Sequence, residues 1–149
     1  MMLHRINNLW SFFFIFMYMD ADTKKEFMVL LPELFAVIKN KLNLQTTPKI
    51  VLKKDIENSN NILGKTAYYN PSDKSITLYI LNRHPKDILR SFAHECVHLY
   101  QHENNMYGIG KNESGDAKYA QNDTELRKAE KQAYLLGNML FRDWEDGKK

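Results

Sequence analysis

The sequence contains very little cysteine, proline and glycine. Of its 149 residues, one is Cys, four are Pro and six are Gly. The single cysteine, Cys96, excludes an internal disulfide, so the fold does not need an oxidising compartment. The scarcity of Pro and Gly excludes collagen-like and linker-like chains. We therefore expect a chain that keeps its shape through a hydrophobic core and is cytoplasmic.

The sequence also lacks a large excess of charge of either sign. It has 21 Lys and Arg against 18 Asp and Glu, and the basic residues are spread along the chain. This pattern does not indicate a nucleic-acid partner, and none is expected. The apolar fraction of 44% and the charged fraction of 26% are typical of a globular protein. The length is that of one domain with one hydrophobic core.

The N-terminal region contains an apolar run, Leu9–Met19. As a helix it would be about 16 Å long, roughly half the thickness of a bilayer core, so it is too short to span a membrane. Three interpretations stay open: an extension packed on the core, a secretory signal or membrane anchor, and a stretch upstream of a true start at Met17 or Met19. We treat 1–22 as a separate apolar segment and place the domain at 23–149.

The rest of the chain shows alternating helical and strand patterns. Helices are predicted for Thr23–Leu42, for Ile88–Tyr100 with Pro85 as first helical residue, and from Asp123 to Trp144. Strands are predicted for Lys49–Leu52 and for a hairpin formed by Lys65–Tyr69 and Ser75–Leu81. Loops are predicted for Asn58–Asn61 and Asn104–Asn122. This order predicts a single α+β domain.

Residues 94–98 form the pattern H-E-x-x-H. Two His four residues apart lie on one face of a helix, at about 40° to each other, so both can reach one Zn²⁺. Glu95 then lies beside the ion, where it can accept a proton from a water molecule. The apolar side chains fall on the opposite side of the helix; they are Phe92, Ala93, Cys96, Leu99 and Tyr100. Cys96 is therefore expected to be a packed thiol rather than a ligand.

A catalytic zinc usually takes three protein ligands and keeps one position open. His102 lies about 80° from His94 on the helix and would converge poorly with it. The last helix offers Glu125 and Glu130, and Glu130 precedes an apolar stretch in which a carboxylate needs a metal or an ionic partner. We expect Glu130 to be the third ligand of one zinc per chain, with Glu125 and His102 as alternatives. Iron, manganese or cobalt would also suit such a site.

These residues resemble the zincin metallopeptidases, in particular the Glu-zincin branch. The resemblance rests on His94, Glu95 and His98, followed about thirty residues later by Glu130-x-x-Ala133. The stretches SFAHECVHLYQHE and AEKQAYLLGNML are similar to small ImmA/IrrE-like and phage-encoded metallopeptidase domains. The resemblance covers roughly Lys49–Trp144. It implies a minimal zincin-like domain, in which a short mixed or antiparallel sheet with a hairpin packs against an active-site helix and a C-terminal helix.

The resemblance also implies an activity. His94, His98 and Glu130 would hold zinc, and Glu95 would be the general base in the hydrolysis of a protein or peptide substrate. The substrate backbone would pair with an edge strand. That strand would consist of Ser75, Ile76, Thr77, Leu78, Tyr79 and Ile80. The alternatives are a catalytically silent zincin-fold regulatory or binding module, and a membrane-tethered protein.

Two supporting roles have no obvious residue. Related Glu-zincins often carry Asp four residues after the ligand Glu, but here that residue is Tyr134. A carboxylate from elsewhere or a backbone carbonyl would then have to orient the imidazoles. The donor that stabilises the oxyanion is also open, with His102, Tyr107 and Tyr119 as candidates.

Overall fold

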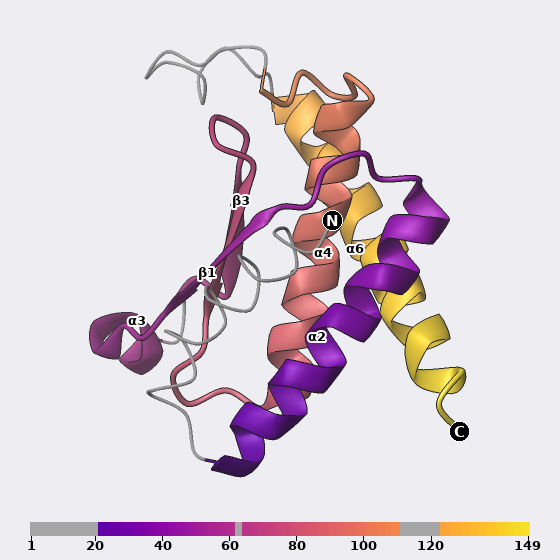
Figure 1. Cartoon of the computed structure of the whole chain (residues 1–149). Coiled ribbons are helices and arrows are strands. Elements are labelled where there is room, and N and C mark those ends of the chain that lie inside the picture. Colours follow the sequence, from indigo (N-terminus) through magenta and orange to yellow (C-terminus); the bar gives the residue numbers. More distant parts are fainter. Residues whose placement is uncertain (1–20, 62–63, 111–122) are drawn as a thin grey trace.

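The computed structural model describes residues 21–61, 64–110 and 123–149 (Figure 1). Within these ranges the chain is a mixed α+β structure with four helices and one three-stranded mixed sheet. The predictions for Leu9–Met19, for Tyr119 and for the part of the Asn104–Asn122 loop after residue 110 lie outside the described residues.

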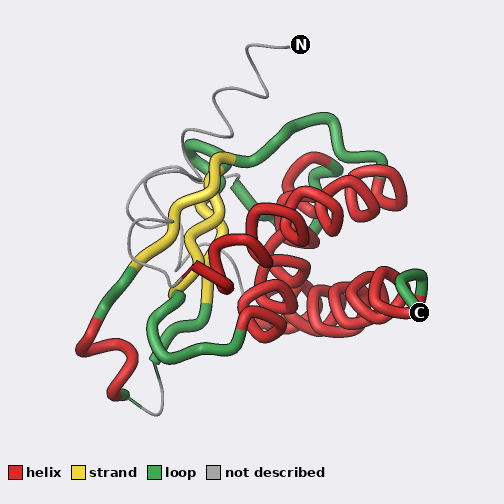
Figure 2. The backbone as a smooth tube through the Cα atoms, turned by 60° about the horizontal axis from the view of Figure 1, so that its bottom comes forward, coloured by secondary structure: helices red, strands yellow, loops and turns green. Residues whose placement is uncertain are grey.

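The elements follow the predicted order, with one additional short helix. The helices are α2 (Ala21–Leu42), α3 (Ile56–Asn60), α4 (Pro85–Glu103) and α6 (Asp123–Asp146), and the strands are β1 (Lys49–Lys53), β2 (Ala67–Asn70) and β3 (Ser75–Tyr79). The three long helices and the hairpin are confirmed. The sheet lies on one side of the molecule and the long helices lie on the other (Figure 2).

The prediction of a loop at Asn58–Asn61 is wrong for most of that segment. Residues up to Asn60 belong to α3, a helix of five residues. The side chain of Asp55 caps it by accepting a hydrogen bond from the N–H of Asn58. A polar Asn/Ser run can therefore become helical because a capping residue satisfies one of its free N–H groups.

The prediction that Ser75–Ile80 forms an edge strand is also wrong. The strand order is β1-β3-β2, so β3 is the central strand, parallel to β1 and antiparallel to β2. All five residues of β3 are buried, as expected for a strand covered on both faces. The backbone of β3 is already paired on both sides, and a substrate could pair only with β2 or β1.

Helix α4 lies at the centre of the core and contacts α2, α6, β2 and β3 (Figure 1). His84 is its N-cap, with a ring that accepts a hydrogen bond from the N–H of Lys86, and Pro85 is its first residue as predicted. Its apolar side packs against α2 and the sheet. The buried side chains that meet there include Phe27, Leu31, Leu34 and Ile38 of α2, Ile76 and Leu78 of β3, and Leu89, Phe92, Cys96 and Leu99 of α4. Cys96 is therefore a packed thiol, as predicted.

In the described part of the chain, no helix combines the length and the apolar character needed to cross a bilayer.

Candidate metal centre

His94, His98 and Glu130 converge where α4 faces α6. The carboxylate of Glu130 lies between the two rings, with Oε2 3.1 Å from His94 Nε2 and Oε1 3.1 Å from His98 Nε2. One ligand atom from each of the three side chains lies within 4.8 Å of the other two. In tetrahedral zinc coordination, with bonds of about 2.0–2.1 Å, neighbouring donor atoms are roughly 3.3 Å apart. The two imidazoles and the carboxylate could therefore hold such an ion.

Gln101 fixes the tautomer of His98. Its amide nitrogen donates to the carbonyl oxygen of Ala129 (2.9 Å) and to Oε1 of Gln132 (3.0 Å). Its amide oxygen is therefore the acceptor that lies 2.8 Å from His98 Nδ1, so Nδ1 carries the hydrogen. In the neutral ring this leaves a lone pair on Nε2, which points at the negative carboxylate of Glu130. Two acceptors at this distance require a proton or a cation between them.

Gln101 is the residue at the cluster that the sequence pattern did not predict. It is fully buried, and it is the partner of His98 Nδ1, a position for which a carboxylate or a backbone carbonyl was expected. The available signal was its position, since a polar residue three places after His98 lies on the same side of α4.

Glu95 lies beside the cluster in a nearly dry environment, with 7% of its surface exposed. Burial raises the pKa of Glu95 above its ordinary value, while the nearby imidazoles of His98 and His94 and a hydrogen bond from the backbone N–H of Tyr69 oppose the rise. A carboxylate with a raised pKa is suited to accept and later return a proton.

The charges of the cluster are strongly coupled. Hydrogen bonds from His94 and His98 hold the pKa of the Glu130 carboxyl well below its usual range. Burial alone lowers the pKa of His98, but the hydrogen bond to Glu130 and the negative charge of Glu95 outweigh it and raise the pKa. The site therefore favours positive charge between its carboxylates.

Gly137 allows α6 to approach α4 at the site. A Cβ at this position would lie 3.0 Å from the Cα of His94 and 3.2 Å from its backbone nitrogen. Both neighbours are backbone atoms and cannot turn aside. Glu130, two turns earlier on α6, reaches the histidines because the two helices are this close.

A groove of about 820 Å³ opens in front of the cluster. It is lined by residues 64–67, which lead into β2, by residues of α4 and by Glu130, Tyr134 and Asn138 of α6. Thr66 bonds β3, because its carbonyl accepts a hydrogen bond from the Tyr79 N–H. In an antiparallel pair, residues whose backbone groups face the partner strand alternate with residues whose groups face away. The N–H and C=O groups of Ala67 and Tyr69 therefore point away from β3. The Tyr69 N–H bonds Glu95, and Ala67 lines the groove. The strand edge that faces the site therefore belongs to β2.

Of the other candidate residues in the described ranges, Tyr134 lies at the cluster, whereas His102, Tyr107 and Glu125 do not. The ring of Tyr134 packs edge-on against His94, with centroids 4.6 Å apart, so Tyr134 is at the site. His102 Nδ1 instead lies 2.7 Å from the hydroxyl of Tyr69, and His102 is not part of the cluster. Glu125 pairs with Lys128 and is also outside it. In the described ranges, neither His102 nor Tyr107 lines the groove.

Comparison of this chain with protein-family models, with curated proteins and with solved structures finds no match.

Proposed function

We propose that this chain is a metal-dependent peptidase that uses zinc to hydrolyse peptide bonds in a protein or peptide substrate. The observation that carries the proposal is the convergence of His94 Nε2, His98 Nε2 and the Glu130 carboxylate, with Glu95 buried next to them. This donor set is one that catalytic zinc uses, with three protein ligands and a remaining open position. When bound, the ion supplies Lewis acidity, which polarises a carbonyl group and makes a water molecule a better nucleophile at neutral pH.

The side chains then have separate tasks. Glu95 accepts a proton from the attacking water and passes it to the leaving amine nitrogen, so that the C–N bond breaks and the two products carry a carboxyl and an amino group. Gln101 keeps the ring of His98 in the required tautomer. The outward N–H and C=O of Ala67 are placed to pair with an extended substrate backbone, and this pairing depends little on side chains.

The metal is tested by elemental analysis of the purified protein. We expect about one zinc per chain in the wild type and a small fraction of that in Glu130→Ala, because removal of one of three ligands weakens the site. The matched control is Glu125→Ala, a carboxylate on the same helix but outside the cluster, which should retain the metal. Equal metal content in all three proteins, or no metal in any, would refute the site.

Catalysis is tested with Glu95→Gln. This variant should bind zinc as the wild type does and lose at least about a hundredfold in peptide hydrolysis, since general base catalysis contributes about that much or more. Metal content and hydrolysis are measured on the same preparation. If Glu95→Gln cleaves as fast as the wild type, the enzymatic interpretation is wrong. A zinc protein without any cleavage would instead be a binding module.

A further inference from the structure

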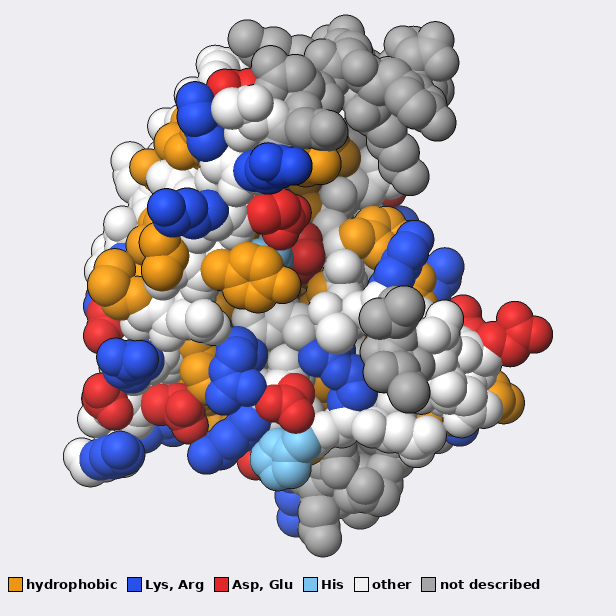
Figure 3. Space-filling model, turned by 180° about the vertical axis from the view of Figure 1, so that it is seen from behind, with side chains coloured by type: hydrophobic (Ala, Val, Ile, Leu, Met, Phe, Trp, Pro, Cys, Tyr) orange, Lys and Arg blue, Asp and Glu red, His pale blue; other side chains and the backbone are white. Residues whose placement is uncertain are grey.

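The groove continues beyond the metal centre along the first half of α4, and this end is basic. Lys65, Arg83 and Arg90 line it, with Asp87 as the one carboxylate among the described residues at this end. The other two carboxylates that line the groove, Glu95 and Glu130, belong to the metal centre. In a space-filling view from behind, Lys and Arg side chains are interspersed with Asp and Glu side chains on this face of the molecule (Figure 3).

Four hydrogen bonds hold the guanidinium of Arg83, and none of their acceptors neutralises its charge. Its Nη1 donates to the carbonyl oxygens of Thr66 (2.9 Å) and Tyr79 (2.8 Å), and its Nη2 donates to the carbonyl oxygen of Asp87 (3.0 Å) and to Oγ of Ser91 (2.7 Å). All four acceptors are uncharged. The Asp87 carboxylate bonds Arg90 instead (2.8 Å). One carboxylate therefore faces three cations.

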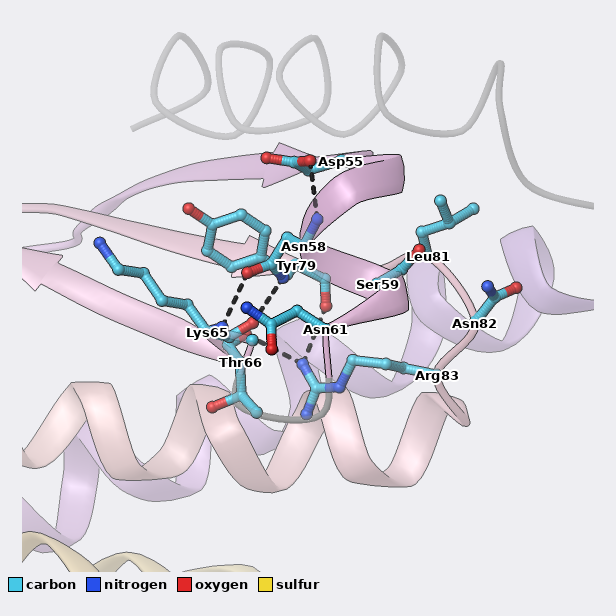
Figure 4. A pocket seen from close by; sticks show the side chains of 11 residues that line it. Asp55, Asn58, Ser59, Asn61, Lys65, Thr66, Tyr79, Leu81, Asn82 and Arg83 are labelled. Carbon is cyan, nitrogen blue, oxygen red and sulfur yellow. Dashed lines mark hydrogen bonds between the residues drawn. The ribbon is translucent and has the colours of Figure 1, made fainter.

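Lys65 is fixed through its backbone. The amide of Asn58 donates to the carbonyl oxygen of Lys65 (2.8 Å) and accepts from its N–H (2.7 Å). The Lys65 side chain extends away from Asn58, while the guanidinium of Arg83 turns towards Thr66 (Figure 4). Throughout the described ranges, neither Lys65 nor Arg83 forms an ion pair with a carboxylate.

The distance from Arg90 to His94 along α4 indicates which residue of a bound peptide would lie near the basic end of the groove. Arg90 precedes His94 by four residues, which is about 6 Å along the helix axis. An extended peptide advances about 3.3 Å per residue. A substrate lying along the groove therefore places a side chain near Arg90 about two residues from the bond at the metal centre.

We infer that the substrate of this site is an acidic peptide, with Asp or Glu two or three residues from the scissile bond, and that Arg90 and Lys65 determine this specificity. The inference rests on the proposed peptidase function. A carboxylate at that position supplies the counter-charge that the basic end of the groove lacks. Arg83 acts as a positioning residue, because it ties the start of β2 to the first turns of α4.

The test is cleavage of a randomised synthetic peptide pool by the zinc-loaded protein, with the products sequenced by mass spectrometry. We expect Asp and Glu to be enriched at one position two or three residues from the cut. The enrichment should fall about fivefold in Arg90→Gln and in Lys65→Gln, as for the loss of a partly exposed ion pair, and should weaken with added salt. Arg90→Lys keeps the charge and should retain most of the preference. Lys39→Gln, a change at an exposed lysine of α2, is the control and should not alter it.

The outcomes separate this inference from the proposed function. Cleavage without an acidic preference, or with a preference that Arg90→Gln and Lys65→Gln leave unchanged, overturns the inference while the peptidase function stands. If the pool is not cut, the proposed function fails. Recognition is then decided by fluorescence anisotropy with zinc-loaded Glu95→Gln and two labelled alanine-based peptides, one with a Glu and one with a Gln. Tighter binding of the Glu peptide supports acidic recognition, and equal binding overturns it.

Discussion

Gln101 is a buried amide whose three hydrogen bonds determine how His98 presents its nitrogen. It has no exposed surface, and it links α4 to α6 through the Ala129 carbonyl and Gln132. Its amide oxygen acts on His98 as the carboxylate of a metal-ligand pair would, but without adding negative charge next to Glu95 and Glu130. The neutral partner limits the electrostatic repulsion in a site that already holds two carboxylates.

Replacement of Gln101 by Met keeps its approximate volume and removes all three hydrogen bonds. We expect zinc affinity to fall about 10- to 100-fold, because His98 loses the partner that fixes its tautomer. Stability should also fall by about 1–3 kcal/mol, since three buried hydrogen bonds are lost, to His98, the Ala129 carbonyl and Gln132. A competition titration against a chromophoric chelator measures the affinity. Gln132→Ala removes one partner of Gln101 but leaves the bond to His98, so it should change affinity far less. Similar losses in both variants would contradict a role for the His98 contact.

The arrangement of elements shows what local pattern can and cannot predict. The three long helices follow from apolar spacing, and the convergence of His94 and His98 follows from their separation of one turn on α4. The role of Ser75–Ile80 could not be deduced in this way, because alternating residues indicate a strand but not its neighbours. Only the parallel pairing of Lys49–Lys53 with β3 makes that strand central and leaves β2 at the edge. Long-range pairing is invisible to periodicity.

The role of Gly137 could not be predicted from local pattern either, because it depends on the contact between α6 and α4. Gly137→Ala should favour helix formation by about 1 kcal/mol through propensity. The added Cβ would meet the backbone of His94, and overpacking of this kind costs about 1–3 kcal/mol. We therefore expect no gain or a net loss of stability, together with weaker zinc binding because α6 carries Glu130 away from α4. Thermal unfolding and zinc titration measure the two effects.

The control for Gly137 is Gly147→Ala. A Cβ at Gly147 would lie 3.4 Å from the carbonyl oxygen of Asp143, an ordinary contact, so this variant should behave as the wild type. A stabilised Gly137→Ala protein with unchanged zinc affinity would show that the helices can separate without cost to the site.

The free energy of unfolding should depend on pH in opposite directions without and with zinc: the metal-free cluster stabilises the fold less as pH rises towards 8, and bound zinc stabilises it more. Without zinc, the raised pKa of His98 stabilises the fold at pH values below its ordinary 6.5, and this contribution is lost as pH rises through the higher folded value. The raised pKa of Glu95 acts in the same direction, because its charged form is disfavoured in the fold. The lowered pKa of Glu130 stabilises the fold above its ordinary 4.5, and this contribution is lost on acidification. Because the contribution of Glu95 is lost as pH rises above 4.5 and that of His98 as pH rises above 6.5, the metal-free cluster is most stabilising near pH 4.5.

Zinc requires the lone pair on Nε2 of each ligand histidine, so protons compete with it and its binding strengthens as pH rises. A free zinc concentration a hundred times the Kd stabilises the fold by about 2.7 kcal/mol, which raises the Tm of a chain of this length by roughly 5–10 °C. We expect this difference in Tm between zinc-loaded and chelator-treated protein at pH 8 and almost none at pH 5. Calorimetry at both pH values measures it, with Glu130→Ala as the variant that should show little difference at either. A gap of equal size at pH 5 and pH 8 would mean that zinc is not held by histidines, because imidazole ligands lose it to protons in this range and carboxylate ligands do not.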